Sequence, residues 1–126
     1  MKTTKNEISE YDTFLAKSSL PIKNIFYSVK KMITDIDDSL FEQINKSMLT
    51  IKKNIKTKPR GIVWLQPSVN YLIIYFAKDK YTSRIYEIFP NGFGGYPYIK
   101  VSSDNFDLEQ IKILTIKALR KIENIL

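Results

Sequence analysis

The chain has 126 residues, the size of one domain, and its 44% hydrophobic content predicts a folded core rather than disorder. It contains no cysteine and no histidine, which excludes disulfides, cysteine nucleophiles, histidine-based catalytic triads and histidine-ligated zinc or iron sites. A formal net charge of +7 favours polyanionic partners such as nucleic acid, although a lysine-rich composition bias explains the same charge without any partner.

No segment of the chain has the length and apolar character of a membrane-spanning helix. Residues 1–10 are polar and lack the apolar core of a signal peptide. The longest apolar run, Tyr71 to Ala77, is far shorter than the roughly 20 residues that cross a bilayer. Together with the absence of cysteine, this predicts a cytoplasmic protein with no membrane partner. We expect one domain over residues 1–126, with residues 1–8 frayed.

Two helices are predicted in the first third of the chain. Ser9 is suited to cap a short helix from Glu10 to about Lys17. A second helix begins at Pro21, which a first helical turn tolerates, and it continues with apolar residues spaced by three and four. The acidic residues that begin at Asp37 are expected to end it. Its apolar face consists of Ile22, Ile25, Phe26, Val29, Met32, Ile33 and Ile36.

The segment from Leu40 to Ile55 is compatible with more than one structure. Residues Met48 to Lys53 could form a short strand at the edge of a sheet, because lysines at such edges discourage pairing with other chains. Residues Asn54 to Arg60 are predicted to form a turn or loop that ends at Pro59.

An antiparallel hairpin is predicted in the middle of the chain. Gly61 to Gln66 is rich in the β-branched and aromatic residues that strands prefer, and Pro67 to Asn70 has the composition of a turn. Tyr71 to Ala77 is nearly all apolar, which predicts a central strand covered on both faces. The elements expected next are a polar turn at Asp79 to Ser83, a strand or helical turn at Arg84 to Phe89, and a glycine loop at Pro90 to Pro97.

A strand and a long helix are predicted to complete the fold. Tyr98 to Ser102 alternates between apolar and polar residues, as a strand does. The helix is expected to begin near Asp107, which stands at capping-box spacing from Gln110, and to continue to the C-terminus. The order of elements predicts an α+β fold, a small antiparallel sheet with the N-terminal helices and the long C-terminal helix packed on one face.

The glycine loop and the residues after it resemble a known family. The run Gly92-Phe-Gly-Gly-Tyr-Pro-Tyr-Ile-Lys-Val-Ser-Ser-Asp-Asn-Phe-Asp-Leu108 leads into a helix that carries Ile111, Leu114, Ala118 and Leu119. This is similar to the C-terminal part of the uncharacterised bacterial and archaeal domains known as predicted transport proteins. The resemblance extends from roughly Ile25 to Ile122. It implies a partner in nucleic-acid transactions, because members often occur beside nuclease-like domains, and it implies no catalytic residue.

The strongest candidate site is a basic segment that contains no acidic residue. Lysines neutralise phosphates without sequence preference, and nearby aromatic residues such as Tyr71, Tyr75 and Tyr81 could stack on unpaired bases. The alternative is a solvated strand and loop whose lysines prevent aggregation. The candidate nucleic-acid-binding residues are Lys46, Lys52, Lys53, Lys56, Lys58 and Arg60.

The aromatic residues of the glycine loop are a second candidate, for binding a protein partner. Phe93, Tyr96 and Tyr98 are suited to an interface, together with an apolar groove expected between the sheet and the C-terminal helix. The backbone amides of the loop could also bind a phosphate, but the loop lacks the P-loop pattern, and a structural turn is the simpler interpretation.

The carboxylates provide no catalytic pattern. Asp35, Asp37 and Asp38 could hold magnesium, or they could simply form a polar turn after a helix. No strand-borne acid is followed by the Glu-x-Lys spacing of a metal-dependent nuclease. We therefore expect no catalytic residue, no metal and no cofactor. The sequence favours a non-enzymatic binding module for nucleic acid or a nuclease-type protein, with a protein-interaction or small-ligand domain as the alternative.

Overall fold

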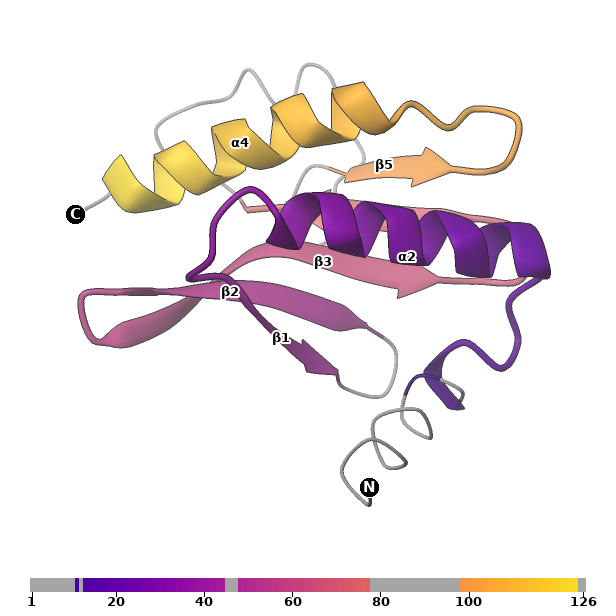
Figure 1. The fold of residues 1–126 in the computed structure, drawn as a ribbon, viewed down its shortest axis with the longest axis horizontal. Coiled ribbons are helices and arrows are strands. Elements are labelled where there is room, and N and C mark those ends of the chain that lie inside the picture. Colours follow the sequence, from indigo (N-terminus) through magenta and orange to yellow (C-terminus); the bar gives the residue numbers. More distant parts are fainter. Residues whose placement is uncertain (1–10, 12, 45–47, 78–97, 125–126) are drawn as a thin grey trace.

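The computed structural model describes residues 11, 13–44, 48–77 and 98–124. Five strands form one antiparallel sheet in which every strand pairs with its neighbours in sequence (Figure 1). Two helices, α2 (Leu20–Thr34) and α4 (Leu108–Asn124), pack against one face of that sheet. The predicted α+β fold is confirmed. The strands are β1 (Phe41–Ile44), β2 (Leu49–Ile55), β3 (Lys58–Pro67), β4 (Leu72–Phe76) and β5 (Tyr98–Val101).

The helix α2 forms where the three-and-four spacing of apolar residues predicts it. Pro21 stands in its first turn, and its buried side chains end at Ile33. The helix stops at Thr34, slightly before the acidic residues expected to end it. Upstream, a helical turn is closed by the amide of Leu15, which donates to the carbonyl of Tyr11 at 2.9 Å. The predicted cap of that earlier helix, Ser9, lies outside the described residues.

The core lies between the helices and the sheet. Strand register aligns Leu49, Leu65, Ile74 and Ile99 in one row across β2 to β5 on the face that the helices cover. The first three of these side chains are fully buried, and Ile99 is partly buried against them. The helices add buried apolar side chains to the same cluster, chiefly Ile22, Phe26, Val29, Ile33, Ile111, Leu114, Ala118 and Leu119.

The strand and the long helix predicted for the last part of the chain are both present. Strand β5 occupies Tyr98–Val101, and β4 lies between β3 and β5 as a central strand. The helix α4 begins after Asp107, whose carboxylate accepts a hydrogen bond from the amide of Gln110 at 3.1 Å. No helix in the described part of the chain is long and apolar enough to cross a membrane. The elements expected between residues 79 and 97 lie outside the described residues.

Two expectations in the middle of the chain are wrong. β2 is not an edge strand, because β1, which was not predicted, pairs along its outer side. The pairs Gln43 with Thr50 and Glu42 with Ile51 belong to this pairing. The turn or loop expected over residues 54–60 is present only as the two-residue turn Lys56 and Thr57, and the expectation that it ends at Pro59 is wrong, because Pro59 lies within β3.

Candidate nucleic-acid interface

The β2–β3 hairpin extends beyond the sheet as a two-stranded ribbon, defined here as residues 53–60. The pairing of β1 with β2 ends at Lys52, and the pairing of β4 with β3 begins at Val63. The ribbon pairs, Lys53 with Arg60, Asn54 with Pro59 and Ile55 with Lys58, therefore have no further described strand beside them. Figure 1 shows the ribbon at the same end of the molecule as the C-terminal end of α4.

The turn of the ribbon has an unusual backbone. Lys56 adopts a φ of 63°, which glycine tolerates freely and which costs other residues free energy. A two-residue connection of this kind matches the right-handed twist of the flanking strands. The side chains of both turn residues are exposed. The geometry therefore places the ammonium group of Lys56 at the outermost point of the ribbon.

Among the candidates that the structure describes, Lys53 is the one whose charge is neutralised by ion pairs within the fold. Its Nζ atom lies 2.7 Å from a carboxylate oxygen of Asp37 and 2.5 Å from one of Glu123. Its side chain is only 19% exposed. Because Asp37 follows α2 and Glu123 lies in the last turn of α4, Lys53 ties the base of the ribbon to both helices. Lys53 therefore stabilises the structure, and its ammonium group, which is already paired with two carboxylates, is not available to bind a phosphate.

Hydrogen bonds at Asp37 change the acidity of this carboxyl. The Lys53 ammonium is the largest cause, and the hydroxyl and amide of Ser39 add to it, so that the pKa of Asp37 falls from 3.8 to about 2. The same contacts raise the pKa of Lys53, with the Asp37 hydrogen bond as the largest cause and the Glu123 hydrogen bond next. Both groups are therefore charged at neutral pH.

The other candidates of the basic segment lie in different places. Lys52 points to the opposite face of β2 from Lys53, where its ammonium donates to the side-chain oxygen of Gln43 at 2.6 Å. Lys46 lies outside the described residues. Lys56, Lys58 and Arg60 are all exposed, and we call this group the basic tip.

The basic tip has a defined orientation. Directly paired residues of neighbouring strands point to the same face, so Arg60 shares the face of Lys53, and Lys58 shares the face of Ile55. This is the side of the ribbon on which the helices lie. None of the ion pairs in the described part of the chain involves a residue of the basic tip.

The C-terminal end of α4 adds cations that the sequence did not assign to a site. The Lys53–Glu123 ion pair holds this end of the helix beside the base of the ribbon. Arg120 is exposed and stands one turn before Glu123, on the same side of the helix. Lys117 is exposed one turn earlier. Only the fold brings Arg120 near the ribbon, because about 60 residues separate it from the ribbon along the chain.

Of the tyrosines expected to accompany the basic segment, the two that the structure describes do not lie at the ribbon. Tyr71 precedes β4 at the opposite end of β3, where the Lys100 ammonium lies 4.3 Å from its ring centroid. Tyr75 is 7% exposed, and its hydroxyl donates to Gln66 at 2.9 Å. Burial is the largest cause of the raised pKa of Tyr75. Tyr81 lies outside the described residues.

The glycine-loop candidate is described only in part. Tyr98 is half-buried, and its ring centroid lies 5.6 Å from that of Tyr75 on the neighbouring strand. Phe93 and Tyr96 lie outside the described residues. Side chains of the core, among them Leu114, Ala118 and Leu119, fill the space between α4 and the sheet, where the sequence suggested a groove.

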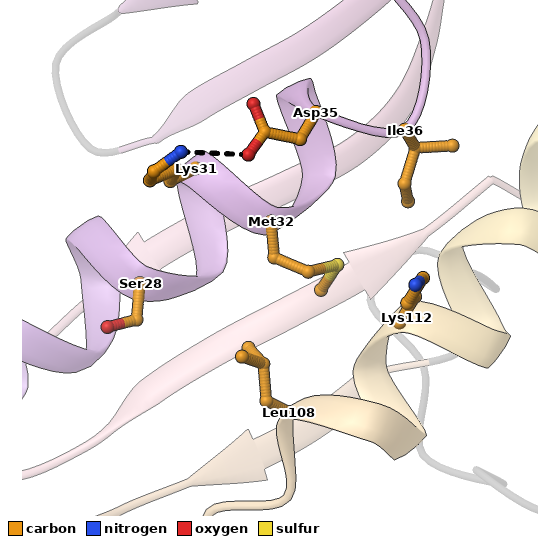
Figure 2. A pocket seen from close by; sticks show the side chains of 7 residues that line it. All are labelled: Ser28, Lys31, Met32, Asp35, Ile36, Leu108 and Lys112. Carbon is orange, nitrogen blue, oxygen red and sulfur yellow. Dashed lines mark hydrogen bonds and ion pairs between the residues drawn. The ribbon is translucent and has the colours of Figure 1, made fainter.

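A groove lies instead between α2 and α4. Its volume is about 470 Å³. Figure 2 shows Met32 of α2 and Leu108 of α4 pointing into the same space, with the Lys31–Asp35 ion pair, 2.9 Å long, at its rim. The residues that line it are Ser28, Lys31, Met32, Asp35, Ile36, Leu108 and Lys112.

The described residues hold no group of three carboxylates that could bind a metal ion. Asp35 pairs with Lys31 and Asp37 pairs with Lys53, so two of the three candidate magnesium ligands already have cationic partners. Comparisons with family models, curated proteins and solved structures find no match to this chain. The resemblance to the predicted transport proteins stays a prediction.

Proposed function

We propose that this chain is a non-enzymatic binding module that contacts nucleic acid, or a nucleic-acid enzyme, through the basic tip. The observation that carries the proposal is the exposure of Lys56, Lys58 and Arg60 together on a two-stranded extension of the sheet. Cations that are exposed in this position can approach a phosphate backbone. Binding would come from phosphate neutralisation and counterion release, with slight sequence preference.

The distribution of acidic groups supports this proposal. Asp37 and Glu123 are the carboxylates that the structure places at the base of the ribbon, and Lys53 engages both. Lys53 cancels one of their two negative charges, and both carboxylates lie at the base of the ribbon rather than at the basic tip. The exposed Arg120 at the end of α4 adds to the positive potential on the same side.

The proposal can be tested by fluorescence anisotropy with labelled single- and double-stranded DNA and RNA at low salt. The ribbon variant carries Lys56→Glu, Lys58→Glu and Arg60→Glu. The control variant carries Lys17→Glu, Lys23→Glu and Lys112→Glu, which lie away from the ribbon. Each reversal removes two charge units, so both variants have a formal net charge of +1 in place of +7.

We expect wild-type protein to bind at least one of the four nucleic acids. The ribbon variant should lose at least tenfold in affinity, because three phosphate contacts become repulsive, and the control variant should lose much less. Circular dichroism would verify that both variants fold. If the wild type bound none of the four, or if both variants lost affinity equally, the basic tip would not be the binding site.

A second candidate is a small-ligand or protein-interaction site, favoured by the groove between α2 and α4. Its floor is apolar through Met32 and Leu108, and Lys112 places a positive charge at one side. This combination suits a ligand with an apolar body and an anionic group. The dye 1-anilinonaphthalene-8-sulfonate is a direct probe, and its fluorescence should rise with wild type but not with Leu108→Glu.

A further inference from the structure

We propose that the nucleic acid bound by the basic tip is B-form duplex DNA, and that the ribbon lies in its major groove. This inference rests on the proposed function and names the substrate class for the same site. Its basis is the shape of residues 53–60. Among the described residues they form a pair of strands with no third strand beside them.

The width of the ribbon fits a major groove. The groove of B-form DNA is about 12 Å wide, and it admits an α-helix or a two-stranded ribbon. Neighbouring strands lie about 4.8 Å apart, so two strands with their side chains can enter where a wider sheet cannot. The pairing of β1 ends at Lys52 and that of β4 begins at Val63, so these strands do not widen the ribbon.

The distance by which the ribbon extends beyond the sheet also fits the depth of a major groove. A strand advances by roughly 3.4 Å per residue, so the four residues from Lys53 to Lys56 carry the turn on the order of 10 Å beyond the sheet. The depth of the major groove is about 8.5 Å. Lys56 can therefore approach the floor of the groove, and the C-terminal end of α4, at the same end of the molecule as the ribbon (Figure 1), would lie against the edge of the groove.

The positions of the basic side chains also fit a ribbon that lies in a major groove. Lys58 and Arg60 lie two residues apart on one face of the ribbon, where they can contact phosphates along the groove wall. Arg120 lies on α4 one turn before Glu123, which contacts the base of the ribbon, and it would meet the phosphates outside the groove. The Lys53 contacts with Asp37 and Glu123 hold the ribbon base in place before binding, which limits the ordering cost.

The geometry distinguishes duplex DNA from the other nucleic acids. The major groove of A-form RNA is deep and too narrow for a ribbon to enter. Single strands are held mainly by stacking on aromatic rings, and Tyr71 and Tyr75, two of the three tyrosines expected to stack, lie away from the ribbon, whereas Tyr81 lies outside the described residues. We therefore expect duplex DNA to bind most tightly of the four nucleic acids.

The first test compares the affinities of wild-type protein for mixed-sequence 20-mers of duplex DNA, duplex RNA, single-stranded DNA and single-stranded RNA at one salt concentration. We expect duplex DNA to bind at least fivefold more tightly than duplex RNA and than either single strand. Equal or tighter binding of another form that the ribbon variant loses would overturn this inference and leave the proposed function standing. The absence of all binding would overturn both.

The second test locates the groove with dimethyl sulfate, which methylates guanine N7 in the major groove and adenine N3 in the minor groove. At saturating protein, we expect protection of guanine N7 on the duplex and unchanged reactivity of adenine N3. The variant Lys56→Ala retains most of the charge and should weaken the N7 protection while salt-dependent binding persists. Protection of adenine N3 alone, or bound duplex with no N7 protection, would overturn the major-groove assignment.

Discussion

Lys53 and Lys58 have the same chemistry and lie five residues apart, yet their environments differ completely. Lys53 is 19% exposed and contacts two carboxylates, at 2.7 Å and 2.5 Å. Lys58 is exposed on the ribbon and has no ion pair in the described part of the chain. A lysine-rich segment thus contains both a residue that fixes the fold and residues available to a partner.

Replacing Lys53 with methionine should lower the free energy of unfolding by about 1–2 kcal/mol, between the ranges measured for exposed and for fully buried ion pairs. The reason is that Asp37 and Glu123 would both lose their cationic partner in a partly buried place. Urea denaturation measures the change. Lys52→Met is the matched control, and a loss as large as that of Lys53→Met would show that the ion pairs do not matter.

The carboxyl of Asp37 should make stability depend on pH in the acid range. Its pKa in the fold is about 2, below its ordinary 3.8, so the unfolded chain binds the proton more tightly. The stabilisation is complete above about pH 4 and is lost as the pH falls toward 2. Urea midpoints measured across this range should fall for wild type and change less for Asp37→Asn. Parallel curves for the two proteins would contradict the role of Asp37.

At the scale of elements, the two helices differ in how they begin. The carboxylate of Asp107 caps α4 by accepting the amide hydrogen of Gln110, whereas the hydroxyl of Ser19 makes no capping bond in α2. Ser19 contributes through its backbone, since its amide donates to the carbonyl of Val69 at 2.9 Å. An alanine in that place keeps the backbone bond.

The substitution Asp107→Ala should therefore lower the unfolding free energy by about 1 kcal/mol, the typical value of a side-chain cap. Ser19→Ala should have a clearly smaller effect, because only the side chain is removed. Thermal or urea denaturation of both variants gives the comparison. A larger loss from Ser19→Ala than from Asp107→Ala would contradict this view of the two helix ends.

Elements with a strong periodic pattern could be predicted from the sequence, and elements with weak patterns could not. The spacing of apolar residues predicted α2 and α4, and the apolar run at Tyr71 to Ala77 predicted β4 as central. The four residues of β1 carry too little pattern to stand out. Pro59 suggested a loop, although it is tolerated next to the closing pair of a hairpin, where the backbone nitrogen points outward.

The sequence predicted which segment carries the candidate site, but it did not predict which side chains of that segment share one surface. The run of basic residues in the sequence identified the basic tip. The partners of Lys53, however, lie 16 and 70 residues away along the chain, and no local sequence pattern predicts them. The pairing of β2 with β3 also shifts between Ile51 and Lys52, which sets the face on which Arg60 lies. Strict alternation along the strands could not have predicted that orientation.

At the scale of the whole molecule, the fold separates two surfaces. The ribbon and the end of α4 gather exposed cations, whereas the groove between α2 and α4 is apolar with a charged rim. The sheet and both helices share one core, and the Lys53 contacts connect the ribbon to it. The basic tip is thus presented by a supported element, which favours a binding surface of fixed shape.

The most direct test of this account is the salt dependence of duplex DNA binding by wild type and by a neutral ribbon variant, Lys56→Gln, Lys58→Gln and Arg60→Gln. Each lost phosphate contact should reduce the slope of log affinity against log salt by about 0.9, so the three together predict a reduction of about 2.7. Parallel slopes for the two proteins would show that the basic tip does not contact the phosphates, and would contradict the account.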